Sequence, residues 1–232
     1  MEQNELLENQ KNELNEFLYR SSHDIVAPIK TIEGLCSLYH LENSDIDNSE
    51  IIKNIQSQTV HLESLVQNLQ NILSVKNQKH HFKPYSINEL ISSIQHNLST
   101  IVKDVTISFH NNTSNDVTIN TDINDVKNIM TTLTENAIKF KDTSKEQSVI
   151  EVRFDVDVNY FYITISDNGL GMNEITKVKA FDMFYRGNEV VTKGSGLGLY
   201  LVKILIENLE GKIELDSKEK IYTKFKISLP LS

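Results

Sequence analysis

The sequence is poor in the residues that define several protein classes. It has one cysteine, Cys36, no tryptophan and three prolines among 232 residues. A single cysteine excludes an internal disulfide framework and a cysteine-based zinc site, and it is typical of a reducing compartment. No apolar run approaches the roughly 20 residues of a membrane-spanning helix, and residues 1–11 are too polar for a signal peptide. We therefore expect a cytoplasmic chain, attached to a membrane only through an upstream segment of a longer protein.

Basic residues are also scarce, with 23 Lys and Arg against 32 Asp and Glu and a formal charge of −9. Nucleic acids and anionic membranes attract clustered Lys and Arg, and we find no such cluster. The sequence therefore predicts no nucleic-acid partner. Its length suffices for one large domain or two small ones.

Residues 1–80 contain one glycine, Gly34, and their apolar residues recur with a period near seven. One seam contains Leu18, Ile25, Ile32 and Tyr39, with Leu7, Leu14 and Leu35 three residues off it; later rows are Ile55, Leu62 and Leu69, and Leu65 and Ile72. This repeat predicts two antiparallel helices, joined by a turn at residues 42–48 and capped by Asp47 or Asn48. Two such helices cannot close a core alone. The simplest remedy is a homodimeric four-helix bundle, and the plainer alternative is a coiled-coil spacer.

From Pro84 onward the pattern is mixed. It predicts helices at residues 86–100, 123–140 and 198–208, and strands at residues 105–109, 117–120, 150–156, 161–166, 212–215 and 225–229. We expect an α+β chain in which a helical hairpin precedes a sheet covered by helices on one face. Residues 76–86 are the predicted linker between the two parts.

Three chemically distinct side chains share one face of the helix that ends at Phe140. Asn136, Lys139 and Phe140 would present an amide oxygen, an ammonium and an aromatic ring. These groups suit magnesium, phosphate and a purine ring respectively. Taken alone, a solvated face with one core aromatic would be the preferred interpretation.

Two glycine clusters follow this helix. Asp167, Gly169 and Gly171 come after a strand, where a carboxylate can accept a hydrogen bond from an adenine amine. The second cluster contains Gly194, Ser195, Gly196, Leu197 and Gly198 and opens a helix. Backbone N–H groups at a helix N-terminus favour phosphate. Either cluster alone is weak evidence, but three elements in this order predict a nucleotide site.

These segments resemble the motifs of the sensor histidine kinases. Thr132 to Phe140 resembles their N box, Asp167 to Gly171 the first glycine box, Phe181 to Arg186 the F box, and Gly194 to Leu199 the second glycine box. The resemblance covers nearly the whole chain. It implies an α/β sandwich of the Bergerat type that binds ATP and Mg²⁺, with residues 1–80 as the dimerisation and histidine-phosphotransfer hairpin and residues 81–232 as the ATP-binding domain.

The resemblance also implies roles for single residues. Asn136 would bind magnesium, Asp167 the adenine, and Phe140 would stack near the base. Lys139 and Arg186 would contact phosphates, together with the second glycine box. Residues 173–193 would form a mobile lid that ATP orders.

Ser22 to Pro28 resembles the family's H box, in which the histidine accepts the phosphoryl group. The heptad count independently puts His23 on the outward face, where a catalytic domain could reach it, although a merely solvated histidine remains an alternative. The attacking ring nitrogen must keep its lone pair, so Asp24 could hold the other ring N–H and take up the released proton. Pro28 has no N–H to donate to the Asp24 carbonyl, and we expect a bend there.

Two positions depart from the family. Thr132 stands where these kinases commonly carry Asn, and where related ATP-hydrolysing proteins carry a water-activating Glu. Threonine cannot act as that base, which favours transfer over hydrolysis. In the H box, Val26 replaces the usual Arg and Ala27 the usual Thr or Asn. Because Ala27 cannot position water, we expect weak or absent phosphatase activity toward the partner.

We therefore expect a histidine kinase that phosphorylates His23 and passes the phosphoryl group to an aspartate of a response-regulator receiver domain, which this chain lacks. One rival is an ATP hydrolase with a dimerisation stalk, which would have no use for the His23 segment. The other is a catalytically idle scaffold, which would not need an intact ATP site.

Overall fold

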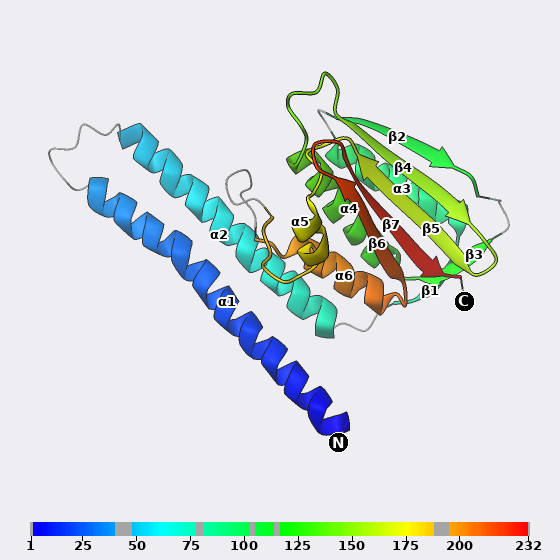
Figure 1. Cartoon of the computed structure of the whole chain (residues 1–232), viewed down its shortest axis with the longest axis horizontal. Helices are drawn as coiled ribbons and strands as arrows, with labels where there is room; N and C mark the ends of the chain where they lie inside the picture. The colour runs from blue at the N-terminus through cyan, green and yellow to red at the C-terminus, as the bar shows by residue number, and fades with distance from the viewer. Residues whose placement is uncertain are drawn as a thin grey trace. The chain divides into compact units, whose positions relative to one another are not determined.

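The computed structural model describes residues 2–39, 48–77, 81–102, 105–113, 117–187 and 195–231 (Figure 1). The chain divides into two compact units, which we describe separately. A helical unit contains residues 1–72 with 193–197, and a mixed unit contains residues 73–192 with 198–232. Among the described residues, no helix combines the length and apolar character that crossing a membrane requires.

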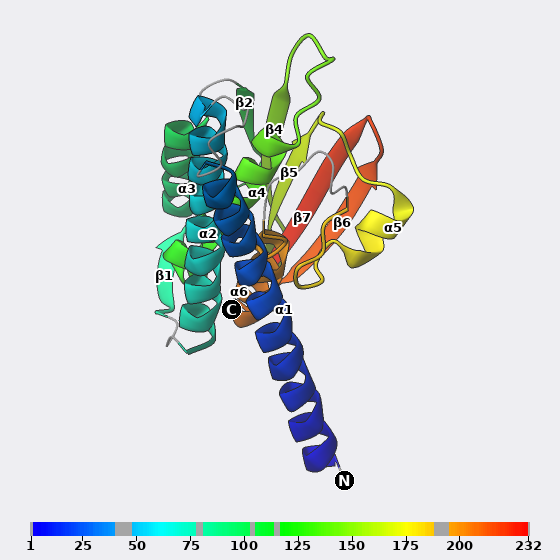
Figure 2. The same ribbon diagram turned by 90° about the vertical axis from the view of Figure 1, so that its left-hand side faces the viewer.

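Two long helices form the helical unit and run antiparallel (Figures 1 and 2). α1 spans Glu2–Tyr39 and α2 spans Asn48–Asn77. The helix α1 continues through Pro28, which is buried. The expected turn and the candidate cap Asp47 lie outside the described residues, and Asn48 is the first residue of α2 rather than a cap preceding it.

Burial along α2 follows one of the two predicted rows. Leu65 and Ile72 are buried, and so is Ile51, two heptads before Leu65. The other row, containing Leu62 and Leu69, is half-buried. Large apolar side chains stay exposed on both helices of the single copy: Val26, Ile29, Leu38, Ile52, Val60, Val66 and Leu73. The hairpin thus leaves apolar surface that its own two helices do not cover.

A five-stranded sheet forms the mixed unit, in the order β2-β4-β5-β7-β6. Its strands are β2 Thr106–Asn111, β4 Val149–Val156, β5 Tyr160–Asp167, β6 Lys212–Lys218 and β7 Tyr222–Pro230. β2 pairs with β4 in parallel, and the other neighbours are antiparallel. The helices α3 Ile87–Ile101, α4 Ile123–Lys139 and α6 Gly198–Asn208 cover one face (Figure 2). The expected sheet with helices on one face is confirmed.

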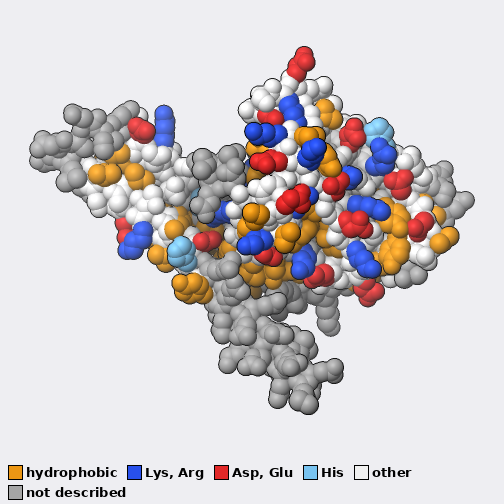
Figure 3. Space-filling view, in the orientation of Figure 1, with side chains coloured by type: hydrophobic (Ala, Val, Ile, Leu, Met, Phe, Trp, Pro, Cys, Tyr) orange, Lys and Arg blue, Asp and Glu red, His pale blue; other side chains and the backbone are white. Residues whose placement is uncertain are grey.

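Strand alternation explains which face the helices cover. Phe154 of β4 and Phe161 of β5 are fully buried, and their rings stack with centroids 6.2 Å apart. The intervening side chains are polar. Packing the helices against one face of each strand therefore removes its apolar side chains from water and leaves the polar face exposed. On that open face Lys224 pairs with Asp216 at 3.1 Å. Basic and acidic side chains alternate there (Figure 3).

Two elements were not predicted. β1 Lys83–Ser86 lies inside the expected linker of residues 76–86 and pairs with β3 Thr118–Thr121 in a separate two-stranded sheet. The linker prediction is therefore wrong for residues 83–86. Their partners in β3 lie more than 30 positions away along the chain, from Ser86 with Thr118 to Lys83 with Thr121, so the pairing leaves no local pattern. A short helix, α5 Glu174–Lys179, lies within the expected lid.

Candidate functional site

The C-terminal turn of α4 carries three of the predicted site residues. Asp122 caps the start of the helix by accepting from the backbone N–H of Asn124, and Phe140 ends it by donating its N–H to the Asn136 carbonyl at 2.9 Å. The Lys139 ammonium lies 5.1 Å from the centre of the Phe140 ring. The structure therefore brings the amide, the ammonium and the ring together at one helix end.

Lys139 lies in a positively charged environment. Burial lowers the pKa of Lys139, and the positive charge of Arg186 lowers it further. Two cations that repel each other are stabilised by an anion placed between or beside them. The predicted pair of phosphate contacts, Lys139 and Arg186, is thus close enough to interact in the structure.

Asp167 ends β5, and its side chain is half-buried. Burial raises the pKa of Asp167 to about 6, while the hydrogen bond from the Gly169 N–H and the charge of Lys145 lower it. The Gly169 nitrogen lies 2.8 Å from Asp167 Oδ1. At neutral pH the group is mostly ionised, so it can accept a further hydrogen bond from an N–H donor.

The loop after Asp167 fits only because it contains glycine. A Cβ on Gly169 would lie 2.4 Å from the Phe140 carbonyl oxygen, and that oxygen also accepts from the Leu170 N–H at 2.9 Å. Gly171 has φ +63°, and a Cβ there would lie 2.1 Å from the Lys218 carbonyl oxygen. The loop is thus seated between the end of α4 and the hairpin that joins β6 to β7.

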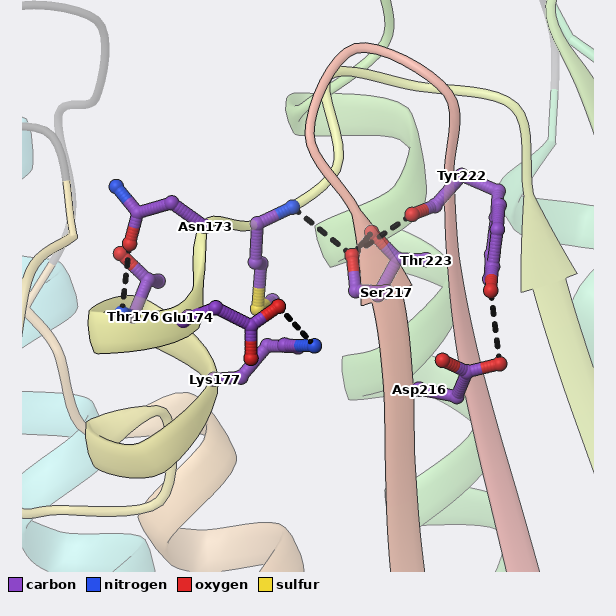
Figure 4. Close-up of polar contacts among 9 residues, drawn as sticks. Asn173, Glu174, Thr176, Lys177, Asp216, Ser217, Tyr222 and Thr223 are labelled. Carbon is purple, nitrogen blue, oxygen red and sulfur yellow. Dashed lines mark hydrogen bonds and ion pairs between the residues drawn. The ribbon is translucent and has the colours of Figure 1, made fainter.

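The chain that leaves this loop is attached to the same hairpin. Ser217 Oγ accepts from the Met172 N–H at 2.9 Å and donates to the Tyr222 carbonyl at 2.7 Å. Figure 4 shows Ser217 beside Tyr222 and facing the start of α5. Asn173 caps α5 through the Thr176 N–H at 2.8 Å. Met172, just before the predicted lid, is therefore held by a part-buried hydrogen bond, and Asn173, the first lid residue, caps α5 through an exposed one.

The second glycine cluster is described in part. Gly194 lies outside the described residues. Ser195 Oγ accepts from the Leu197 N–H at 3.3 Å, and Gly196 has φ +67°, which favours glycine. Leu197 is fully buried. Gly198 opens α6, where a Cβ would lie 3.3 Å from Thr132 Cγ2, so the start of α6 lies against the N-box part of α4.

His23 belongs to the helical unit. Its side chain is 74% exposed, as the heptad count predicted. Its Nδ1 lies 3.4 Å from Asp24 Oδ1, and Asp24 itself is largely buried, with 24% of its side chain exposed. If Nδ1 carries the proton and donates it to this carboxylate, Nε2 keeps a free lone pair that faces water.

The residues at the end of α4 fit a magnesium ion bound together with phosphate. Within the part of the chain that the structure describes, no three His, Cys, Asp or Glu side chains gather as a metal site. Asn136 is half-buried, and its side-chain amide has no hydrogen-bond partner among the described residues. Mg²⁺ is commonly bound by one or two protein oxygens plus substrate phosphates, and the Asn136 amide oxygen can supply one of them.

Two residues of the site had no signal in the sequence. Lys145 contacts the backbone of the first glycine loop, and Ser217 holds the chain that leaves it. Both act through tertiary contacts with residues more than 20 positions away. A lysine in a polar turn and a serine in a strand are unremarkable as residue types.

Comparison with known proteins identifies related chains. Residues 121–232 match the family described as histidine kinase-, DNA gyrase B-, and HSP90-like ATPase. Over 93% of its length the chain is 27% identical to the autoinducer 2 sensor kinase/phosphatase LuxQ of Vibrio vulnificus. It is 30% identical over 94% of its length to the sensor protein RprX of Bacteroides fragilis.

A solved structure supports the fold. The crystal structure of histidine kinase ThkA in complex with the response regulator protein TrrA matches 97% of this chain with a TM-score of 0.73 and 20% identity, and the match covers 64% of that chain. The chain spans 26% of LuxQ and 43% of RprX, so it corresponds to only part of those relatives.

Proposed function

We propose that this chain phosphorylates its own His23. The chain is the catalytic core of a sensor histidine kinase, and its residues 121–232 belong to the histidine kinase-, DNA gyrase B- and HSP90-like ATPases. ATP is the donor, and an aspartate of a response-regulator receiver domain is the final acceptor. The observation that carries the proposal is the half-buried carboxyl of Asp167, held by Gly169 against the helix end that presents Asn136 and Lys139.

The ATP-binding roles follow from the chemistry of these groups. The ionised Asp167 accepts from the exocyclic amine of adenine, and the Phe140 ring packs near the base. Lys139 and Arg186 bind phosphate oxygens, with backbone N–H groups from the cluster of Gly194, Ser195, Gly196, Leu197 and Gly198. Asn136 would hold a magnesium ion together with the phosphates, and such an ion would supply charge neutralisation for phosphoryl transfer.

His23 receives the phosphoryl group. Asp24 accepts from Nδ1–H and fixes the tautomer, so Nε2 attacks the γ-phosphorus. The new N–P bond forms as the bond to the β–γ bridging oxygen breaks, and ADP leaves. Once Nε2 is phosphorylated the ring carries an extra positive charge, and Asp24 can take up the Nδ1 proton. When the phosphoryl group passes to the receiver aspartate, Nδ1 takes the proton back from Asp24 and neutral His23 is restored.

Several further assignments belong to this proposal. Residues 1–80 serve dimerisation and phosphotransfer, and residues 81–232 bind ATP. The apolar side chains exposed on α1 and α2 support a homodimer through the hairpin. The ThkA complex with TrrA supports a response-regulator partner.

Both ATP and receiver domains are found in the cytoplasm, which is where the proposal locates the chain. Ala27 leads us to expect little phosphatase activity, and acceleration of regulator dephosphorylation by the chain with ADP would contradict that.

The test is labelling with γ-labelled ATP and magnesium. We expect label that is stable in base and lost in acid, as a phosphoramidate requires. His23→Gln should abolish the label, whereas the control His96→Gln, an exposed histidine of α3, should retain it. Labelling that persists in His23→Gln would overturn the acceptor assignment.

The same assay separates the rival functions. Release of labelled phosphate without any label on the protein would favour an ATP hydrolase. If the chain shows no labelling and binds no nucleotide, the scaffold function is favoured. Thr132, which cannot act as a base for water, supports transfer over hydrolysis.

A further inference from the structure

The Lys145 ammonium lies among three backbone carbonyl oxygens of the mixed unit. Its Nζ is 2.5 Å from the Asn168 oxygen, 3.1 Å from the Ile221 oxygen and 3.5 Å from the Gly169 oxygen. An ammonium has three N–H donors and no acceptor. The number of oxygens therefore matches the number of donors, with the Gly169 contact the longest.

A tight turn after α4 directs Lys145 to this position. Asp142 Oδ1 accepts from the Ser144 N–H at 3.0 Å and from the Ser144 hydroxyl at 2.6 Å. The Lys145 N–H donates to the Asp142 carbonyl at 3.2 Å. The Ser144 hydrogen bonds also lower the pKa of Asp142, which keeps the turn-forming carboxylate ionised. The turn thus orders the residues just before the lysine.

The three carbonyls come from two segments that are far apart in the sequence. Asn168 and Gly169 belong to the first glycine loop, and Ile221 belongs to the hairpin between β6 and β7. The same hairpin donates the Lys220 N–H to the Leu170 carbonyl at 2.5 Å. Lys145 therefore joins the loop to the hairpin, and Asp167 immediately precedes the loop.

The side chain of Asn168 is already engaged and does not replace Lys145. Its Oδ1 accepts from the Val149 N–H at 2.9 Å, and its Nδ2 donates to the Gln147 carbonyl at 2.9 Å. The Asn168 side chain fixes the loop to the start of β4. Its carbonyl oxygen needs a separate donor, and Lys145 supplies it.

We propose that Lys145 is a positioning residue for base recognition, which holds the first glycine loop so that the Asp167 carboxylate accepts from a 6-aminopurine rather than a 6-oxopurine. This inference rests on the proposed ATP-binding function. Lys145 does not contact the nucleotide, because its ammonium is directed at backbone carbonyls. It acts through the geometry of the loop and through its charge.

The electrostatics of Asp167 agree with this geometry. Burial raises the pKa of Asp167, and the Gly169 N–H and the Lys145 charge both oppose that rise. Among the charged groups that the structure describes, Lys145 is the one whose charge acts on this pKa. Removing the ammonium would take away one of the two effects that lower the pKa of Asp167. The pKa would then rise, and Asp167 would become protonated at higher pH.

The experiment uses the full chain with Mg²⁺ and measures dissociation constants for ADP and inosine diphosphate by calorimetry from pH 5.5 to 8. Inosine diphosphate carries an oxygen where ADP carries the 6-amine. The variants are Lys145→Met, which removes the donors and the charge, and Lys145→Gln, which keeps a donor without charge. Lys212→Met, an exposed lysine of β6, is the control for loss of a surface charge.

We expect Lys145→Met to reduce the preference for ADP over inosine diphosphate by about tenfold and to move the acidic loss of ADP binding to higher pH. Lys145→Gln should show the same pH shift with a smaller loss of preference, and Lys212→Met should behave as the unmodified chain. An unchanged preference and pH midpoint in Lys145→Met would overturn the inference. So would an equal loss for both nucleotides together with a lower unfolding temperature, because that is the result of a purely structural role. Failure of the unmodified chain to bind ADP would instead reject the proposed function itself.

Discussion

The burial of Asp167 predicts that the nucleotide-free protein is less stable with this carboxyl ionised. The folded pKa of Asp167 is about 6, against 3.8 for the ordinary group. The native state therefore binds this proton more tightly than the unfolded state does, and the contribution of Asp167 to stability falls as pH rises from about 4 to about 6. Replacement by Asn removes the titration, so Asp167→Asn should gain stability relative to the unmodified chain as pH rises.

The size of the effect follows from the two pKa values. A difference of about two units corresponds to about 3 kcal/mol when the group is fully ionised in both states. Roughly half of this cost is already present at pH 5, because the unfolded carboxyl is ionised there. Between pH 5 and pH 8 the difference in unfolding free energy between Asp167→Asn and the unmodified chain should therefore change by the remaining half, on the order of 1 kcal/mol. Any fixed effect of the amide cancels between the two pH values.

Urea unfolding followed by far-ultraviolet circular dichroism at both pH values measures this change. Asp157→Asn is the matched control: hydrogen bonds from the Asn159 N–H, the Tyr162 hydroxyl and the Tyr160 N–H lower the pKa of Asp157. A lowered pKa makes stability fall only below about pH 4. Asp157→Asn should therefore change the unfolding free energy by the same amount at pH 5 and at pH 8. If Asp167→Asn changes the unfolding free energy by the same amount at pH 5 and at pH 8, the carboxyl is not buried as described.

Two further substitutions test how the loop after Asp167 is held. Gly171→Ala should destabilise the protein by at least about 2 kcal/mol and weaken ADP binding, because the new methyl would meet the Lys218 carbonyl and φ is positive. The control Gly34→Ala, at a position with open space around the Cβ, should be neutral or slightly stabilising. A Gly171→Ala variant as stable as the unmodified chain would refute the described loop. Ser217→Ala should cost about 2 kcal/mol in the same unfolding assay, because two backbone groups lose their partner. Ser228→Ala, in β7, should cost far less, and equal losses would contradict the role given to Ser217.

Local patterns predicted most of the fold. The segment 150–156 alternates buried and exposed residues, and β4 extends it by one residue to Val149. The helix predicted from residue 123 begins at Ile123, because Asp122 supplies the cap. Ser86 caps α3 and is not its first residue, so the expected start was one position early. These elements were predictable because their signals lie within the element itself.

The parts that escaped prediction depend on distant partners. β1 is four residues long, contains Pro84 and exists through its pairing with β3. The proposed nucleotide-binding residues Asn136 and Asp167 could be named from motifs. The partial burial of Asp167 could not be predicted, since it depends on how β5 meets the end of α4. The contacts of Lys145 depend on the same tertiary arrangement.

The pairing of β1 with β3 decides where the ATP-binding part of the chain can be cut out. A fragment that began at Ile87 would lose β1, the Ser86 cap of α3 and the His81 N–H that Asp122 accepts at 2.9 Å. β3 would then expose an unpaired edge, which is a surface prone to aggregation. A fragment for expression should therefore start at or before His81, even though the motifs proposed to bind nucleotide begin some 50 residues later.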